Sequence, residues 1–263
     1  MTDRTTINGE VRAYWEDHPC GTSAEEVGDA GQLSAEWFES IERSRYLDEP
    51  FIHEVAQFGR HRGQRVLEVG VGAGTDHLQF ARAGALCHGV DLTQAAIDMT
   101  AKRLELHGLS SDLRRVDAEE LPFDDEAFDL VYSWGVIHHS DKPERIVAEI
   151  HRVLRPGGEL IAMMYKRRSL YTFRLWVRHA LLDGRPWTSF AEVLWNHMES
   201  VGTKGYTSSE LRRLFGQFQH LSLRTIMSGE RQHPLLRFVP NDLEFFIAIR
   251  AVKGSPSGAG GGG

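Results

Sequence analysis

The sequence predicts an α/β domain with a mostly parallel sheet and helices on both faces. Between residues 65 and 165, short β-rich runs alternate with stretches of helical periodicity, an order typical of βαβ units. Each run is nearly all apolar, as expected when helices bury both faces of the sheet. The expected strands are 65–69, 86–91, 113–116, 128–133 and 159–165, and the expected helices are 75–83, 94–107 and 143–154.

The flanking segments divide the chain into further parts. Residues 1–60 form an N-terminal arm and an amphipathic helix, at 35–59, that Pro50 breaks or kinks; we expect them to cover the site. The aromatic and basic stretch 166–206 is too long for a loop, so we expect a helical cap inserted after the fifth strand of the 61–165 core. A helix at 208–215 and strands at 221–227 and 245–252 place 207–253 back in the core, and the glycine-rich 254–263 is a linker-like tail.

Composition and charge exclude several classes of protein. The 263 residues carry a net charge of -7, which argues against a general nucleic-acid or anionic-membrane surface. Cys20 and Cys87 have no metal-ligand spacing, so we expect no metal site. No signal-peptide core and no run of 18 apolar residues occurs. We therefore expect a cytoplasmic monomer or homodimer that acts on a small molecule.

A glycine-rich turn follows the first expected strand, in RVLEVGVGAGTD. Glycine lets a backbone approach a ligand closely and adopts positive φ without strain, and the amide groups of the next helix point at the same place. Taken alone, such a turn fits either a nucleotide-like cofactor or tight packing.

The second expected strand ends at Asp91, whose carboxylate is placed to accept hydrogen bonds from ribose hydroxyls. An N-cap for the next helix is the alternative, with Thr93 a competing cap. The turn reads G-x-G-x-G, whereas the dinucleotide fingerprint requires glycine where Thr75 stands. A pyrophosphate is therefore not the expected ligand.

With this turn, VDAEELPFDDEAFDLVYSWGVIHH and EIHRVLRPGG resemble class I S-adenosylmethionine-dependent methyltransferases. The resemblance covers roughly residues 60–165 and is greatest to the ubiquinone and menaquinone biosynthesis branch. It implies a Rossmann-like sheet of seven strands, one of them antiparallel. It also implies S-adenosyl-L-methionine as methyl donor and S-adenosyl-L-homocysteine as product.

The resemblance assigns the binding of the cofactor's nucleoside to four positions. Asp91 would hold the ribose hydroxyls, with Leu92 against the adenine. Asp117 would meet the adenine amino group and the backbone N–H of Ala118 a ring nitrogen. A purely structural role as a turn former is the alternative for Asp117.

Two further groups of positions would surround the rest of the cofactor. The methionine portion would lie among residues of the first strand and its turn, which are Glu68, Gly70, Gly72 and Gly74. The wall beside the sulfonium would be formed by Ser133 and Trp134, at the end of the fourth strand.

Methyl transfer mainly requires alignment of a nucleophile with the methyl carbon, so a base is optional. His138 and His139 follow the fourth strand, at the edge where such sheets bind ligands, and are the expected catalytic residues. We favour His139, because the Ser140–Asp141 turn can orient its ring. A base role predicts an acidic limb near pH 6.5, and packing or helix capping is the alternative for either histidine.

The expected substrate contacts come from the arm and the cap. Tyr14 and Trp15 either fold over the cofactor or pin the arm to the domain. Tyr165, Arg174 and Arg178 belong to an aromatic and basic region that suits an anionic or aromatic acceptor, the alternative being a solvated basic face. Arg43, Arg45 and Tyr46, on the helix before the first strand, either reach the cofactor carboxylate or, for the arginines, form surface ion pairs.

The predicted function is methylation of a small molecule on oxygen or nitrogen, in specialised metabolism. A C-methyltransferase acting on a quinone-like or acidic carbon and a peptide methyltransferase are alternatives on the same fold. A non-catalytic S-adenosylmethionine-binding protein is the alternative from a different class.

Overall fold

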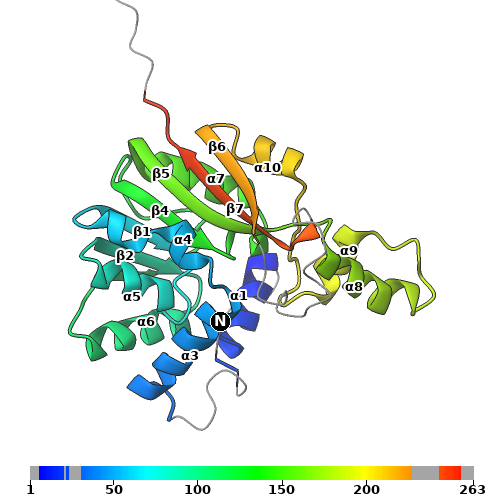
Figure 1. Cartoon of the computed structure of the whole chain (residues 1–263), viewed down its shortest axis with the longest axis horizontal. Helices are drawn as coiled ribbons and strands as arrows, with labels where there is room; N and C mark the ends of the chain where they lie inside the picture. Colours follow the sequence, from blue (N-terminus) through cyan, green and yellow to red (C-terminus); the bar gives the residue numbers. More distant parts are fainter. Residues whose placement is uncertain (1–5, 21, 24–30, 227–242, 256–263) are drawn as a thin grey trace, which may run out of the picture.

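The computed structural model describes residues 6–20, 22–23, 31–226 and 243–255, and its centre is one sheet of seven strands (Figure 1). The strands are β1 (Arg65–Val69), β2 (Leu86–Asp91), β3 (Asp112–Arg115), β4 (Phe128–Trp134), β5 (Leu154–Tyr165), β6 (Gln219–Ile226) and β7 (Phe246–Val252). Their order is β3-β2-β1-β4-β5-β7-β6. Every pair is parallel except those made by β7, which is antiparallel to β5 and β6. This confirms the predicted seven-stranded sheet with one antiparallel strand.

The apolar runs are continuous because both faces of the sheet are buried. Leu67 of β1 packs in a core cluster with Ile150, whereas the adjacent Val66 packs on the opposite face with Phe80. In register, Val66 lies between Cys87 of β2 and Leu130 of β4. Successive side chains of a strand point to opposite faces, so each strand supplies apolar groups to both clusters.

Helices cover the two faces as predicted. One face packs against α7 (Pro143–Val153) and α10 (Ser208–Leu214), the other against α4 (Ile52–Ala56), the 3-10 turn η1 (Phe58–His61) and α5 (Thr75–Arg82). Next to α5 lie α6 (Gln94–Leu106) and α3 (Ala35–Asp48). The break predicted at Pro50 is present, between the end of α3 and the start of α4.

The N-terminal arm is a helix, α1 (Ile7–Asp17), where we expected an arm of undefined structure. Thr6 caps it by accepting a hydrogen bond from the Gly9 N–H. The Glu16 carboxylate accepts the backbone N–H groups of Gln94 and Ala95, at the start of α6. A carboxylate is favourable at a helix N-terminus, so this contact fixes α1 beside the edge of the sheet.

The inserted cap lies between β5 and α10 and projects from the side of the sheet in Figure 1. It contains α8 (Leu170–Trp176), a π-helical turn η3 (Val177–Leu181) and α9 (Phe190–His197). The Trp176 indole N–H donates to the Thr188 carbonyl, 2.8 Å away. In the part of the chain that the structure describes, no helix is long and apolar enough to span a bilayer.

Candidate active site

A cavity of about 320 Å³ opens at the carboxyl edge of the parallel strands, a size ordinary for small-molecule sites. Because the strand order is β3-β2-β1-β4-β5-β7, it runs from the loops after β2 and β3 to the ends of β5 and β7. Its lining includes many predicted site residues, namely Trp15, Glu68, Gly70, Gly72, Asp91, Leu92, Asp117, Ala118, Trp134, His139 and Tyr165.

The turn after β1 contains three glycines, and its backbone lies at the middle of the cavity. Gly70, Gly72 and Gly74 have φ of 85°, 53° and 72°, a region that strains other residues. A Cβ on Gly70 would collide with Val136, and one on Gly74 would lie 2.8 Å from the Thr100 hydroxyl oxygen. A Cβ on Gly72 would meet nothing within 4 Å, so only Gly72 leaves its open side free.

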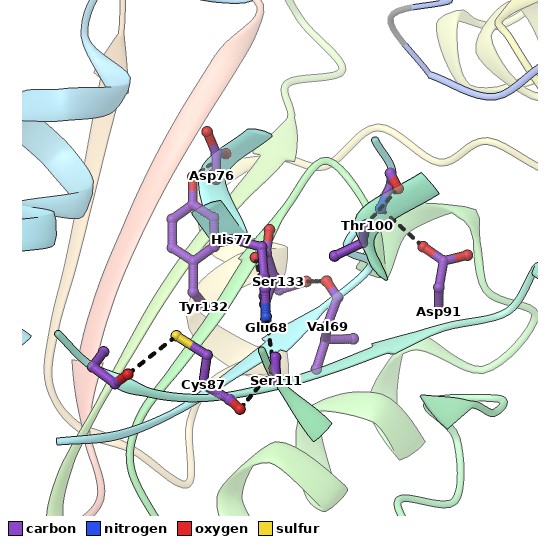
Figure 2. Close-up of polar contacts among 12 residues, drawn as sticks. Glu68, Val69, Asp76, His77, Cys87, Asp91, Thr100, Ser111, Tyr132 and Ser133 are labelled. Carbon is purple, nitrogen blue, oxygen red and sulfur yellow. Dashed lines mark hydrogen bonds and ion pairs between the residues drawn. The ribbon is translucent and has the colours of Figure 1, made fainter. Parts of the chain in front are cut away.

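Asp91 holds the turn while leaving acceptor capacity for a ligand. One carboxylate oxygen of Asp91, labelled in Figure 2, accepts the Gly72 N–H at 3.1 Å. The other accepts the N–H and the hydroxyl of Thr93. Thr93 is itself the N-cap of α6, so Asp91 does not serve as that cap. Loss of water around Asp91 raises the pKa of its carboxyl, although these hydrogen bonds lower it in part.

Asp117 lies at the end of the cavity nearest β3, where it has two hydrogen-bond partners. One oxygen accepts the Glu119 backbone N–H at 3.0 Å, and the other accepts the Asn8 side-chain amide at 2.9 Å. The turn-forming role is therefore present, and Asp117 and Ala118 also line the cavity. The contact with Asn8 brings α1 over this end.

Glu68 and His77 form a buried pair under the turn (Figure 2). The Ser111 hydroxyl donates to the Cys87 carbonyl, so its oxygen accepts the Nε2–H of His77 at 2.9 Å. Burial lowers the pKa of His77 to about 4 and, with nearby carboxylates, raises that of Glu68 well above its usual range. Both shifts favour the uncharged forms of the pair, whose Glu68 Oε2 and His77 Nδ1 lie 3.0 Å apart.

Asp76, at the start of α5, accepts hydrogen bonds from three side chains, one of which, Tyr132, is labelled beside it in Figure 2. The sequence analysis missed this residue. It accepts two hydrogen bonds from Arg45, at 2.6 and 3.2 Å, and one each from the hydroxyls of Tyr46 and Tyr132. Burial raises the pKa of Asp76, but the guanidinium of Arg45 and these hydrogen bonds outweigh it and the net shift is downward. Arg45 lines the cavity while paired with Asp76.

His139 faces the cavity from η2 (Ile137–His139), which begins to coil after β4 as predicted. The Thr203 hydroxyl donates to the Ser200 carbonyl at 2.7 Å, and its oxygen lies 3.0 Å from Nδ1 of His139. Ser200 Oγ lies 2.9 Å from the same nitrogen. These two hydroxyls hold the ring in one orientation, and Nε2 has no hydrogen-bond partner among the described residues.

Two expectations about His139 are corrected. Its ring is oriented by Ser200 and Thr203 of the segment after α9, and the Ser140 hydroxyl instead donates to Glu119. Burial, together with the positive charge of Lys204, lowers the pKa of His139 to about 3. The ring is therefore neutral at pH 7, and an acidic limb near pH 6.5 is not expected from it.

His138 does not reach the cavity. Its ring is fully buried against Tyr165, with centroids 3.8 Å apart, and neither ring nitrogen has a hydrogen-bond partner among the described residues. Burial lowers its pKa well below the usual range. The expected catalytic role of His138 is therefore corrected to packing, the alternative that the sequence left open.

Two carboxylates that the sequence analysis missed line the cavity toward the ends of β5 and β7. Glu199, after α9, accepts the Tyr165 hydroxyl at 3.1 Å, and its Oε2 lies 3.6 Å from Nε2 of His139. Glu49, after α3, accepts the Trp134 indole N–H at 2.6 Å. Enclosure by protein raises the pKa of both carboxyl groups.

Comparison with known proteins agrees with this architecture. The methyltransferase domain family matches residues 67–162. A phthiotriol/phenolphthiotriol dimycocerosates methyltransferase of Mycobacterium tuberculosis is 47% identical over 98 residues, which are 36% of this chain and 36% of that protein. A ubiquinone biosynthesis O-methyltransferase of Coxiella burnetii is 27% identical over 139 residues, covering 52% of this chain and 59% of that protein.

The solved structure of magnesium protoporphyrin IX methyltransferase from Synechocystis PCC 6803, with bound S-adenosylhomocysteine, superposes with a TM-score of 0.61 at 15% identity. The likeness covers 94% of this chain and all of that one. Residues 67–162 thus match the methyltransferase domain family, and the chain shares the fold of the solved methyltransferase. The match spans only about a third of the first relative's length.

The remaining predicted residues lie outside the described lining of the methyltransferase cavity. Ser133 is buried and donates its hydroxyl to the Val69 carbonyl, and Gly74 packs against α6. Tyr14 stacks on His18 and is not among the residues that line the cavity. Arg174 and Arg178 are exposed on the cap and are not among the residues that line the cavity.

The sequence signals for the missed residues were weak. Asp76 follows the turn directly, in GTDH, where an acidic residue near a helix N-terminus has an ordinary explanation. Glu49 and Glu199 lie in segments without a motif, and only folding brings them to the methyltransferase cavity. A lone glutamate in a polar segment is usually solvated, so neither stood out.

Proposed function

We propose that the protein transfers a methyl group from S-adenosylmethionine to the oxygen or nitrogen of a small-molecule acceptor. S-adenosylmethionine supplies an electrophilic methyl group and leaves as a neutral thioether. The observation that carries the proposal is one cavity whose β2–β3 end is equipped for a nucleoside and whose β5–β7 end is equipped for a second molecule.

At the nucleoside end, the chain would hold the cofactor with acceptors that are already oriented. Asp91 would receive the ribose hydroxyls and Asp117 the adenine amino group, with Leu92 packing beside the base. Gly72 offers an open backbone to the methionine portion, because a side chain there would fill the cavity. Such preorganised acceptors favour binding because they need not be ordered on association.

At the acceptor end, His139 presents the bare Nε2 of a neutral ring. This nitrogen can accept a hydrogen bond from an O–H or N–H of the methyl acceptor. That contact would direct the lone pair of the acceptor's oxygen or nitrogen toward the methyl carbon. Trp15 of α1 lies edge-on to His139, with centroids 5.5 Å apart, and would exclude water above it. We propose His139 as the polar contact that aligns the acceptor.

Isothermal titration calorimetry with S-adenosylmethionine, S-adenosylhomocysteine and NAD tests the cofactor. Binding of the first two and not of NAD is expected. Incubation with methyl-labelled cofactor and a metabolite extract, followed by mass spectrometry, tests turnover through S-adenosylhomocysteine and labelled product. Cofactor binding without product from any fraction would favour the non-catalytic alternative, and absence of cofactor binding would overturn the proposal.

A small molecule is proposed as the acceptor in place of a nucleic acid. The net charge of -7 repels a polyanion, and the acceptor end of the cavity is itself lined by carboxylates. The same charge argues against an anionic membrane surface as a partner. We propose that the protein works as a monomer or homodimer.

A further inference from the structure

We propose that the acceptor carries a protonated amine, recognised by Glu199 and Glu49 within a ring of aromatic side chains at the β5–β7 end of the cavity. The inference rests on the proposed methyltransferase function and names its substrate class. It differs from the anionic acceptor expected from Arg174 and Arg178, because those residues are not among the residues that line the cavity, whereas Glu199 and Glu49 are.

The position of Glu199 assigns it to the acceptor. The nucleoside end is marked by Asp91 and Asp117, after β2 and β3, while Glu199 contacts Tyr165 at the end of β5. Two strands, β1 and β4, lie between these ends in the sheet order. Glu199 is therefore separated from the carboxylates at the nucleoside end by the middle of the cavity, where the glycine turn and Trp134 lie.

Among the described residues, Glu199 lacks a cationic partner. Within the described ranges, no lysine or arginine lies at ion-pair distance from it, and its contacts are the Tyr165 hydroxyl and the neutral ring of His139. Its side chain keeps 41% of its surface accessible although protein encloses it, because it lines the cavity. A ligand cation would supply the missing partner.

Glu49 adds a second negative group to the same end. Its only cationic partner among the described residues is Arg45, at 3.7 Å, and Arg45 is also engaged by Asp76. The charge of Glu49 contributes to the raised pKa of Glu199, as like charges do at short range. A cation bound between them would relieve that repulsion.

His139 gives an independent indication that a hydrogen-bond donor belongs here. The residue is only 5% exposed, and its Nε2 is buried without a partner, a costly state for a polar atom. In the neutral tautomer with its proton on Nδ1, Nε2 carries a lone pair that can accept a hydrogen bond from a ligand. An ammonium has several N–H donors and no acceptor, which matches His139 and the two carboxylates together.

The walls of this end suit a cation with an apolar body. Trp15, Trp134, Tyr165 and Phe246 line the cavity around the carboxylates. Aromatic faces attract cations, and more strongly where water is excluded. A neutral or anionic acceptor would gain less from these faces and, if anionic, would be repelled by Glu199.

An ammonium nitrogen has no lone pair, so it must lose one proton before it can be methylated. The Glu199 carboxylate would accept that proton and become the neutral acid, while the nitrogen keeps the electron pair. The raised pKa of Glu199 makes it the stronger base of the two groups beside the ligand, since the pKa of His139 lies at about 3.

Calorimetry with three probes of similar shape tests the inference at pH 7: benzylamine, benzyl alcohol and benzoate. Each is titrated into the full chain, with and without saturating S-adenosylhomocysteine. Benzylamine is expected to bind roughly tenfold or more tightly than benzyl alcohol, as expected for a charged hydrogen-bonded group. Equal or tighter binding of either other probe, or no binding of benzylamine at millimolar concentration, would overturn the inference.

Glu199→Gln supplies the decisive variant, because glutamine can still accept the Tyr165 hydroxyl but carries no charge. It should lose about tenfold in benzylamine affinity and keep its affinity for S-adenosylhomocysteine. Glu192→Gln, on an exposed position of α9 outside the cavity lining, should change neither. An unchanged preference for benzylamine in Glu199→Gln and in Glu49→Gln would refute the assignment. Failure of the wild type to bind S-adenosylhomocysteine would instead refute the proposed function. The titrations without S-adenosylhomocysteine would still measure the preference for the amine.

Discussion

Nε2 of His139 lies 3.6 Å from Oε2 of Glu199, and the two residues come from different parts of the chain. His139 belongs to the turn after β4, whereas Glu199 follows the last helix of the cap. The hydroxyls that orient the His139 ring, those of Ser200 and Thr203, come from the same segment as Glu199. The segment after the cap helices therefore completes this end of the cavity with polar groups.

Replacing His139 with alanine should lower the rate of acceptor methylation by about 10- to 100-fold, the value of one or two lost hydrogen bonds in a closed site. Cofactor affinity should be unchanged. Because the pKa of His139 is about 3, its titration should not affect the rate near pH 6.5. The pH dependence of the rate in this range should therefore be the same in the wild type and in His139→Ala. His107→Ala, remote at the end of α6, is the control, and a limb near pH 6.5 that His139→Ala removes would contradict the neutral ring.

The buried His138 should make stability depend on pH. Its folded pKa lies well below the unfolded value of about 6.5, so below pH 6.5 the unfolded chain binds a proton that the native state does not. His138 therefore costs stability increasingly as pH falls from 6.5, by up to about 1.4 kcal/mol per pH unit. His138→Phe retains a ring to pack on Tyr165 and removes this loss. Urea unfolding should show that the free energy of unfolding falls less between pH 7 and pH 5 in the variant than in the wild type. An equal fall in the two proteins would contradict the assignment.

Asp76→Asn should destabilise the fold by roughly 3 to 5 kcal/mol, because it leaves the guanidinium of Arg45 without its carboxylate. The matched control is Asp112→Asn, which breaks a surface ion pair with Arg114 and should cost under about 1 kcal/mol. Chemical denaturation of both variants measures the difference. Similar losses in the two would show that the Asp76 cluster contributes no more than a surface pair.

Asp91→Ala should weaken S-adenosylhomocysteine binding about tenfold or more, the effect of losing hydrogen bonds to two ribose hydroxyls. The Gly72 N–H also loses its acceptor, so far-ultraviolet circular dichroism must show that the variant is folded. Asp98→Ala, exposed on α6, is the control and should bind normally. Wild-type affinity in folded Asp91→Ala would remove this residue from the binding site.

Arg178→Gln should leave acceptor binding unchanged, because the residue is exposed and lies outside the cavity lining. Benzylamine affinity is the measurement, with Glu199→Gln as the variant expected to respond in the same titration. A change in Arg178→Gln comparable to that in Glu199→Gln would restore the anionic-acceptor reading of the cap.

The core of this fold was predictable because its signals are local. Strands buried on both faces, such as β1 and β4, read as continuous apolar runs, and the positive φ of Gly70 and Gly72 is written in the residue type. Asp91 was found because a carboxylate after a strand has a fixed place at the sheet edge. The direction of an amphipathic cap helix is different, since periodicity shows which residues share a face but not what that face meets.

By itself the sequence determined the sheet and the turn, and it placed Asp91 and Asp117 after strands of that sheet, because these features depend on periodicity and on residues close together in the chain. Only the tertiary structure decided the acceptor end. Glu49, His139 and Glu199 are joined there by contacts between α3, the turn after β4 and the cap. Their protonation also depends on how far folding removes them from water, a property of the assembled cavity and of no segment alone.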